Sequence, residues 1–498
     1  TNLRDWNISR QIWWGHRIPV YTCASCGAVA VQIEAPVSCG ACGGEVEQDP
    51  DTLDTWFSSA LWPFAVLGWP DADEFSAACE QGAYPTALMI TGRDILYLWI
   101  VRMVMTSLEF TEKIPFRQVL VHPTVLNVEG RRMSKSLGTG VDPLDLIGKY
   151  GSDATRFSLL YQCTSDQDIR FGEERTEMAR NFCNKIWNAS RFVLMNLGED
   201  FSPAEDVAGR IAKEGALAER WILSRCSAML KTAGEALAAC ELGDAARAMY
   251  EFFWSEFCDW FVEMCKPALR AGGEEAEAAR QSLWFVLERT LRALHPFMPF
   301  ISEEIWQKLP AAGEALIAAR WPEPNAGWRD EEAERQMEAL MEVVVAARKL
   351  RAEQNVPQGQ RVSITAACEA EQARSVLASN EEAVLLLARG SDLTIGEDTS
   401  ARPTVAEVTH CYGAPAMVSI SIAESQTDLE ERRRRLARRL AALEQEEARQ
   451  GAKLANGEFL RRAPAAVVEK ARARYAEIHE ERTGVEAQLA DLAQSLAD

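Results

Sequence analysis

The residues with the clearest chemistry form one short loop, Gly130-Arg131-Arg132-Met133-Ser134-Lys135-Ser136-Leu137-Gly138. Glycines at both ends let the backbone approach a ligand closely, and the hydroxyls of Ser134 and Ser136 can donate hydrogen bonds. Lys135 and Arg132 add positive charge, so the loop fits a bound polyphosphate. A solvated basic turn is the alternative for a motif this short.

A second group of residues is a pair of Cys-x-x-Cys turns, Cys23 with Cys26 and Cys39 with Cys42, separated by twelve residues. Each turn can present two thiolates to one cation, and four thiolates close a tetrahedral zinc site. No coordination position stays open, so the predicted Zn²⁺ is structural. Disulfides and idle thiols are the alternatives; a reducing compartment opposes the first and the doubled spacing opposes the second.

Length and charge limit the class of protein. A chain of 498 residues should hold several domains, since single cores seldom exceed about 300 residues. The net charge of −21 argues against a general nucleic-acid coat, but residues 425–498 carry fourteen Lys and Arg against fourteen Asp and Glu. Local fields, rather than totals, steer a polyanion, so RNA binding stays open.

The predicted location is a reducing cytoplasm, because the other cysteines are scattered and no secretory signal opens the chain. Thr1 stands where an initiator Met would, so a fragment is expected. The most apolar run, Ile95 to Leu108, is interrupted by Arg102 and falls short of the roughly 20 residues that span a bilayer. It is predicted to be a buried helix, with no membrane partner.

Several elements must position these residues. A strand is predicted to end at Gly92-Arg93-Asp94 and to open into a helix, and a second strand, from Gln118 to Val128, leads into the 130–138 loop. A short helix is predicted near Leu144 to Tyr150. Trp13 and Trp14 fit either a core or a position beside a cleft.

The rest of the chain is predicted to be mostly helical. Apolar residues recur at helical spacing from about 172 to 325, and residues 330–424 read as a small α+β segment. The last 74 residues contain two apolar stripes with heptad-like spacing, joined by a short turn, which is the pattern of an antiparallel coiled coil. One stripe consists of Leu429, Leu436, Leu440 and Leu443, and the other of Val468, Tyr475, Ile478, Val485, Leu489 and Leu492. Its arginines Arg432, Arg433, Arg434 and Arg435 can contact phosphates, or can simply form a solvated face.

The loop resembles the Lys-Met-Ser-Lys-Ser signature of class I aminoacyl-tRNA synthetases, with Arg132 in place of the first lysine. Three further stretches resemble the valyl-tRNA synthetase family: Trp6 to His16, Asp54 to Phe64, and Asn181 to Ala189. The terminal coiled coil is also similar to that family's carboxy-terminal arm. The sequence departs from the family at Pro123, where glycine is usual and where proline removes a backbone N–H.

The resemblance implies roles for individual residues. ATP, with Mg²⁺, would be bound by Gly92, Asp94, Arg132, Ser134, Lys135 and Ser136, and Lys135 would be the catalytic group. Trp56, Ile95 and Trp99 would line the amino-acid pocket, the last two lying one helical turn apart. The implied partners are valine and tRNA(Val), and a monomer is expected.

Class I enzymes need a second signature, His-Ile-Gly-His or a near relative, but no two of the five histidines here are three residues apart. The chain is therefore predicted to be the carboxy-terminal part of such an enzyme, inactive alone, with the missing amino-terminal half as a partner. The resulting fold is multidomain and mainly α with α/β. Its predicted parts are the second half of a Rossmann-like catalytic domain (1–170, zinc knuckle at 21–45), a helical anticodon-binding bundle (171–328), an α+β connector (329–424) and a coiled-coil tRNA-binding arm (425–498).

Two alternatives remain at this point. One is a fragment of an isoleucyl or leucyl enzyme, which the Trp13-Trp14-Gly15-His16 run and the terminal coiled coil oppose. The other is a zinc-containing tRNA-binding module without catalysis. The absent first signature favours that module, whereas the intact 130–138 loop favours part of an enzyme.

Overall fold

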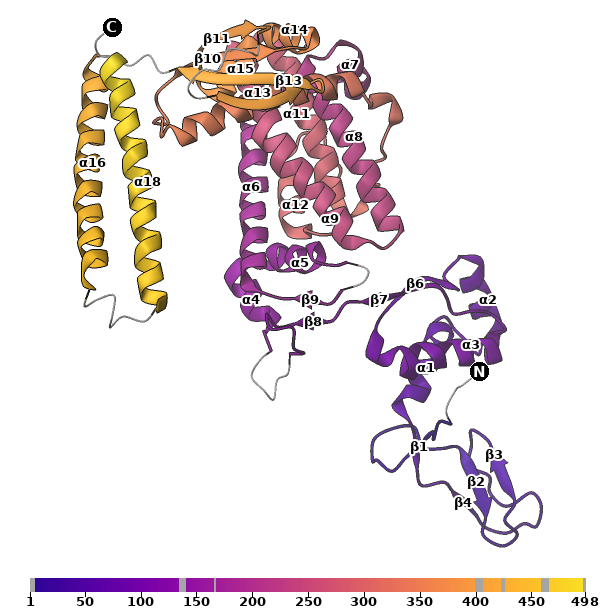
Figure 1. The fold of residues 1–498 in the computed structure, drawn as a ribbon. Coiled ribbons are helices and arrows are strands. Elements are labelled where there is room, and N and C mark those ends of the chain that lie inside the picture. Colours follow the sequence, from indigo (N-terminus) through magenta and orange to yellow (C-terminus); the bar gives the residue numbers. More distant parts are fainter. Residues whose placement is uncertain are drawn as a thin grey trace. The chain divides into compact units, whose positions relative to one another are not determined.

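A computed structural model describes residues 5–133, 140–164, 167–398, 406–421, 426–457 and 465–495, with only the backbone at 426–432, 465–466 and 491–495. The chain divides into two units, Thr1–Glu331 and Glu332–Asp498, which are described separately (Figure 1). The division into four domains stays a prediction. In the described part of the chain, no helix has both the length and the apolarity needed to cross a membrane.

The first unit begins with a small antiparallel sheet that carries the cysteine turns. Strand β2 (Val20–Cys23) lies between β3 (Val29–Val31) and β4 (Val46–Gln48). A second strand pair, β1 (Ser9–Arg10) with β5 (Thr52–Leu53), brings the first residues of the unit to the start of the first long helix. That helix, α1, spans Thr55–Ala65.

Two parallel strands follow, β6 (Thr86–Gly92) and β7 (Phe116–His122). Between them lies a helical segment that begins as a 3-10 turn (Arg93–Ile95), continues as a π-helical turn (Leu96–Ile100) and ends as α3 (Val101–Thr111). Ile100, Met103 and Phe116 form its buried core.

Two predictions for this region are corrected. The expected strand from Gln118 to Val128 breaks after His122, because Pro123 cannot continue the ladder, and the chain resumes as β8 (Val125–Leu126). The apolar helix is not buried all round, since Leu96, Met105 and Leu108 are 38%, 45% and 47% exposed. Only one face of this helix packs against the described residues.

Helices form the rest of the first unit. The long helix α6 shows why: its buried residues recur every three or four positions, which places them on one face. The helices and connecting elements of this part are α2 (Ala72–Glu80), α4 (Pro143–Tyr150), α5 (Ser152–Tyr161), β9 (Ile169–Arg170), α6 (Glu173–Leu197), α7 (Val207–Glu214), α8 (Leu217–Ala238), α9 (Leu242–Glu251), a π-helical segment (Phe252–Phe261), α10 (Val262–Ala271), α11 (Gly273–Leu294) and α12 (Pro299–Trp306).

A buried carboxylate joins α5 to α12. Asp153 accepts hydrogen bonds from the backbone amides of Phe300 at 3.1 Å and Ile301 at 2.7 Å. These amides belong to the first turn of α12, where backbone donors have no partner within the helix. Asp153 therefore caps α12 from a helix that lies more than a hundred residues earlier in the chain.

The second unit contains a mixed sheet with the strand order β11-β10-β13-β12. Its elements are α13 (Glu331–Glu353), β10 (Val362–Cys368), α14 (Glu371–Ser379), α15 (Glu381–Ala388), β11 (Gly390–Gly396), β12 (Ala406–Cys411) and β13 (Ala414–Ser421). The predicted α+β segment is therefore present. The chain continues into two long helices, α16 (Gln426–Ala455) and α18 (Ala465–Ser495).

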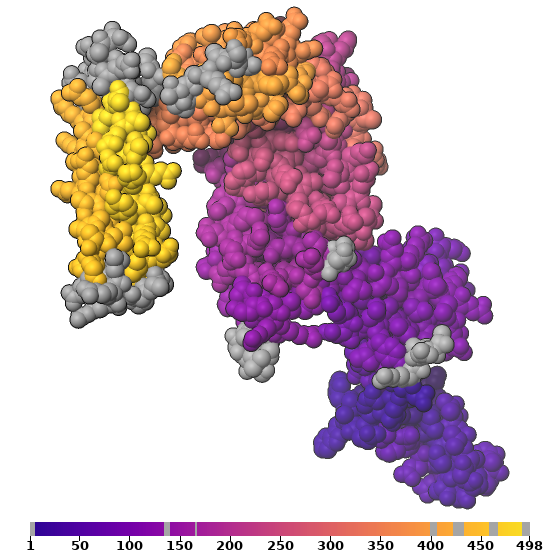
Figure 2. Space-filling view, viewed as in Figure 1, coloured from indigo at the N-terminus to yellow at the C-terminus, as the bar shows by residue number. Residues whose placement is uncertain are grey.

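The helices α16 and α18, orange-gold and yellow in Figure 2, pack along each other. Leu443, Ile478 and Val485 form the buried centre of the contact, with Leu436, Leu440 and Leu489 packed against them. Ion pairs from Arg439 to Glu481 and from Glu446 to Arg474 give the two helices an antiparallel register.

Candidate nucleotide and amino-acid site

The predicted nucleotide residues gather where the two parallel strands end. Gly92 is the last residue of β6 and lies opposite His122, the last residue of β7. In open α/β sheets ligands bind beyond the carboxyl ends of the strands, so this edge is the place to look for a nucleotide. Asp94 follows directly in the 3-10 turn, with an exposed side chain.

A tight turn delivers Arg132 to the same edge. The Asn127 side chain accepts a hydrogen bond from the amide of Arg131 at 2.7 Å, and Gly130 takes a positive φ of 77° that favours glycine. Arg132 then forms an isolated antiparallel β-bridge with Leu126, and its side chain forms an ion pair with Asp94. Three predicted ATP residues, Gly92, Asp94 and Arg132, are thus brought together; Ser134, Lys135 and Ser136 lie outside the described residues.

Asp168 joins the strand ends and was not singled out from the sequence. Its carboxylate accepts from Arg93 at 2.5 Å and from the amide of Thr124 at 2.9 Å. It therefore ties the turn after β6 to the connection after β7. No local pattern marks it, because Arg93 lies 75 positions away.

The three predicted pocket residues lie on two packed elements. Trp56 is in the first turn of α1, which packs against the π-helical turn and α3. A buried hydrogen bond from Thr106 Oγ1 of α3 to the carbonyl of Ala60, at 2.7 Å, holds these helices together. Ile95 and Trp99 are half-buried, and Trp99 packs against the Ile100, Met103 and Phe116 core.

The expected spacing of Ile95 and Trp99 needs correction. They do not lie one turn apart on a regular α-helix, because Ile95 ends a 3-10 turn and Trp99 lies in a π-helical turn. A π turn holds one residue more than an α turn, and such bulges are frequent at functional sites. Sequence periodicity does not reveal a change of this kind.

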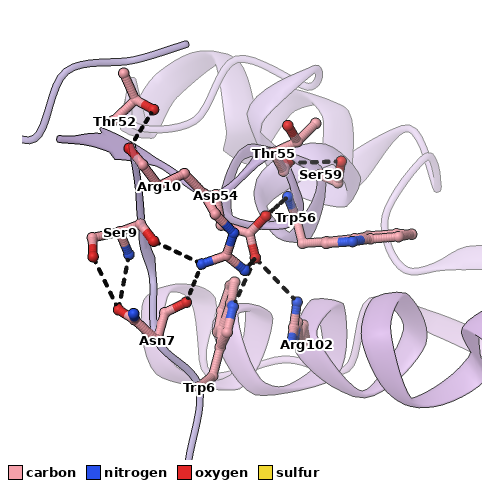
Figure 3. Close-up of polar contacts among 10 residues, drawn as sticks. All are labelled: Trp6, Asn7, Ser9, Arg10, Thr52, Asp54, Thr55, Trp56, Ser59 and Arg102. Carbon is pink, nitrogen blue, oxygen red and sulfur yellow. Dashed lines mark hydrogen bonds and ion pairs between the residues drawn. The ribbon is translucent and has the colours of Figure 1, made fainter. Parts of the chain in front are cut away.

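A polar centre built on Asp54 was also missed (Figure 3). Its carboxylate caps α1 through the amide of Trp56 at 3.4 Å and accepts from the indole of Trp6 at 2.9 Å. Arg10 donates to it at 2.7 Å, and Arg102 lies 3.7 Å away. The one available signal was an Asp at a helix start, which predicts a cap and nothing more.

Trp13 and Trp14 are 105% and 91% exposed, so the core alternative is wrong for the part of the chain that the structure describes. Nearby Ile12 is 50% exposed.

The four cysteines of the paired turns converge. All their Sγ atoms lie within 4.8 Å of one another, with Cys23 to Cys42 at 3.6 Å and Cys26 to Cys39 at 3.7 Å. A disulfide needs about 2.05 Å, whereas four sulfurs at about 2.3 Å from one zinc are about 3.8 Å apart. Gly27 and Gly43, with φ values of 72° and 71°, form the turns that bring the thiols together.

The environment of the cysteine cluster favours thiolates unequally. The backbone amides of Cys26 and Ser25 lower the pKa of Cys23 to about 6. For Cys42 the amide of Gly44 favours the thiolate, but the neighbouring thiols outweigh it and raise the pKa to about 12. The negative charge of one thiolate disfavours ionisation of the neighbouring thiols. All four thiols can therefore ionise together only when a bound cation offsets this repulsion.

The arginines of α16 are placed on the surface. Arg433, Arg434 and Arg435 are exposed, while the side chain of Arg432 lies outside the described residues. Other cations of the helix pair are held by carboxylates: Arg439 by Glu481, and Arg474 by Glu446 and Glu477.

Three family models match successive parts of the chain. Residues 1–172 match tRNA synthetases class I (I, L, M and V), residues 219–366 match the anticodon-binding domain of tRNA ligase, and residues 428–493 match the valyl tRNA synthetase tRNA binding arm. They follow one another without overlap.

Curated relatives match along almost the whole chain. It is 44% identical over 497 residues to the valine–tRNA ligase of Carboxydothermus hydrogenoformans, covering 99% of this chain and 55% of that protein. It is 43% identical over 512 residues to the valine–tRNA ligase of Symbiobacterium thermophilum, with the same coverage. The chain therefore spans about half the length of these relatives.

A solved structure shares the fold. The LeuRS of Agrobacterium radiobacter K84, in a ternary complex with tRNA and LeuAMS, aligns with a TM-score of 0.52 and 22% identity. The alignment covers 66% of this chain and 43% of that one. It shows a class I synthetase fold, mostly helical with α/β content.

Proposed function

The chain belongs to the valyl-tRNA synthetases, and we propose that it supplies the carboxy-terminal half of an enzyme that activates valine with ATP and transfers it to tRNA(Val). The observation that carries the proposal is the meeting of Gly92, Asp94 and Arg132 at the carboxyl ends of β6 and β7. There a carboxylate suits ribose hydroxyls and a guanidinium suits phosphates. The Arg132 and Asp94 ion pair would exchange partners when ATP, with Mg²⁺, binds.

The chemistry requires no protein nucleophile. The valine carboxylate attacks the α-phosphorus of ATP, the bond to the bridging oxygen breaks, and pyrophosphate leaves. Lys135, with Ser134 and Ser136 beside it, would stabilise the charge that grows on the phosphates. A ribose hydroxyl at the 3′ end of the tRNA then attacks the adenylate carbonyl, and AMP leaves.

Valine would be recognised by apolar surface. Trp56, Ile95 and Trp99 offer indole rings and an aliphatic chain to a branched side chain. Such a pocket rejects threonine only weakly, because a hydroxyl in place of a methyl group changes the shape little; valine enzymes are themselves the standard example of this limit.

The proposed activity is tested by valine-dependent exchange of pyrophosphate into ATP. The complete enzyme, meaning this chain with the amino-terminal segment that its relatives carry, should catalyse exchange with valine. The 498-residue chain alone should bind tRNA(Val) but show no exchange, because no His-Ile-Gly-His signature lies among its residues. Robust exchange by the chain alone would contradict this division of the site, and no exchange by the complete enzyme would contradict the function.

We also propose that Cys23, Cys26, Cys39 and Cys42 hold one structural Zn²⁺. The spacing of their sulfur atoms supports this, since it suits a tetrahedral ion and is too long for disulfides. The metal would hold the 21–45 knuckle together and take no part in the reaction.

Metal analysis of the purified chain should find one zinc per molecule. Cys39→Ser should remove most of it, because three ligands bind more weakly than four. Cys79→Ser is the matched control, since Cys79 lies on α2 outside the cluster. A chain that is metal-free when purified under reducing conditions would refute the site.

The paired helices α16 and α18 are proposed to form a coiled-coil arm that contacts the tRNA backbone. The exposed Arg433 and Arg435 support this role, since no ion pair joins either of them to a carboxylate among the residues that the structure describes, and such charges can release counterions from RNA. The remaining layout follows the predicted parts: a catalytic half at 1–170, an anticodon-binding bundle at 171–328 and a connector at 329–424, in a monomeric cytoplasmic enzyme.

Arg433→Ala combined with Arg435→Ala should weaken tRNA(Val) binding and flatten its dependence on salt. Two lost phosphate contacts would reduce the slope of log affinity against log salt by up to about 1.5. Arg474→Ala is the control, because Glu446 at 3.2 Å and Glu477 at 3.1 Å already neutralise that guanidinium. Equal slopes for both variants would assign these arginines to a solvated face.

A further inference from the structure

One buried carboxylate, that of Asp54, connects three separate segments of the first unit. Asp54 lies at the start of α1, and its backbone amide donates a hydrogen bond to the carbonyl of Ile8 at 2.7 Å. Its two oxygens accept from Trp6, Arg10 and the Trp56 amide, and the residue is only 5% exposed. Figure 3 shows these groups converging on it from the amino-terminal segment, α1 and α3.

Loss of the Asp54 carboxylate would leave nearby positive charges without a partner. One carboxylate faces two guanidinium groups, Arg10 at 2.7 Å and Arg102 at 3.7 Å. The Arg102 side chain is 11% exposed, and within the described residues its Nη1 has no hydrogen-bond partner, so its contact with Asp54 is ionic. Removing one member of a buried pair leaves the other uncompensated, which costs far more than losing a surface pair.

Trp6 completes the group by touching both charges. Its indole N–H donates to Asp54, while the Arg102 guanidinium stacks over its ring at 3.8 Å from the centroid. A cation over an indole face is attracted to it, most strongly where water is excluded. The orientation of Arg102 is therefore set by Asp54 and Trp6 together.

The contacts of Asp54 also connect the elements that carry the proposed amino-acid pocket residues. Asp54 precedes Trp56 by two residues and holds its amide, so it determines where the first turn of α1 begins. Arg102 follows Trp99 by three residues in the helical segment that also carries Ile95. The contact between Asp54 and Arg102 thus joins the element bearing Trp56 to the element bearing Ile95 and Trp99.

We infer that Asp54 is a positioning residue that sets the separation of the two walls of the valine pocket. The inference rests on the proposed function of that pocket. Asp54 does not itself face the substrate in this account: it acts through Trp56 on one side and through Arg102 on the other. Its loss should therefore change the recognition of valine and leave that of ATP intact.

The test uses pyrophosphate exchange by the complete enzyme, with KM measured separately for valine and for ATP. Asp54→Asn keeps a good helix cap but removes the charge that Arg10 and Arg102 face. It should raise the KM for valine by about tenfold, less than the roughly 100-fold that a 1 Å misplacement can cost, and leave the KM for ATP within twofold. Trp6→Phe keeps every charge and the aromatic ring, so it should fold normally and raise the valine KM by a smaller factor.

Asp71→Asn is the matched control. Asp71 caps α2 through the amides of Asp73 and Glu74 and is exposed, so the variant makes the same chemical change at a cap with no link to the pocket. It should leave both KM values unchanged. If Asp54→Asn and Trp6→Phe lower only the thermal midpoint or kcat, with the valine KM unchanged, the inference is wrong while the function stands. An unsubstituted enzyme without valine-dependent exchange would overturn the function and the inference together.

Discussion

Replacing Lys135 with alanine in the complete enzyme is expected to slow formation of valyl-adenylate by about 100-fold or more. The negative charge on the phosphates grows as the pentavalent transition state forms, so a fixed ammonium group stabilises that state more than the bound substrates. Deleting one preorganised electrostatic partner costs about this much in rate. The affinity for valine should barely change, because the proposed valine pocket consists of Trp56, Ile95 and Trp99 and does not include Lys135.

Single-turnover adenylation, with separate titrations of valine and ATP, distinguishes rate from binding. Arg132→Lys is the control for charge, since it keeps a cation and restores the residue usual in the family signature; its effect should be mild. If Lys135→Ala leaves the rate intact, or weakens valine binding as much as it slows the reaction, the role assigned to the 130–138 loop is wrong.

The spacing of residues in the sequence predicts their arrangement where that arrangement depends only on neighbouring residues. The cysteine turns were predicted because two residues between the cysteines of each pair, and a glycine after each turn, determine where the sulfur atoms lie; the structure brings all four sulfur atoms within 4.8 Å of one another. Residues of the two predicted apolar stripes, Leu443 on α16 with Ile478 and Val485 on α18, are buried together for the same reason. A helix repeats every 3.6 residues, so its apolar face can be read from the sequence.

Contacts between distant segments were not predictable in this way. Arg102 lies 48 positions after Asp54, and nothing in either neighbourhood marks them as a pair. Arg93 and Asp168 are likewise joined only by the fold. Two further differences have physical causes that a sequence pattern does not carry. The π turn at Leu96–Ile100 changes the number of residues per helical turn between Ile95 and Trp99, and Pro123 ends β7 within a run of strand-forming residues.

The second large effect is expected at Gly243, where α9 meets the end of α5. A Cβ atom at this position would lie 1.9 Å from the carbonyl oxygen of Cys163 and 2.9 Å from its carbonyl carbon. Neither is the tip of a flexible side chain, so the backbone itself must move. Arg247 opposes that movement, because it holds α9 in place through the carbonyl of Tyr161 at 2.9 Å.

Gly243→Ala should therefore destabilise the helical bundle by about 3 kcal/mol, the upper part of the range for an overpacked core. Gly234→Ala is the matched variant in α8, where the nearest atom to the added Cβ is Trp321 Nε1 at an ordinary 3.5 Å. Relief of the poor helix propensity of glycine should make that variant more stable by up to about 1 kcal/mol. The chain has more than one unit, so the opening free energies are best measured by hydrogen exchange of the α5 and α9 amides. Changes of the same sign in the two variants would show that the approach of Gly243 to Cys163 does not limit the stability of the bundle.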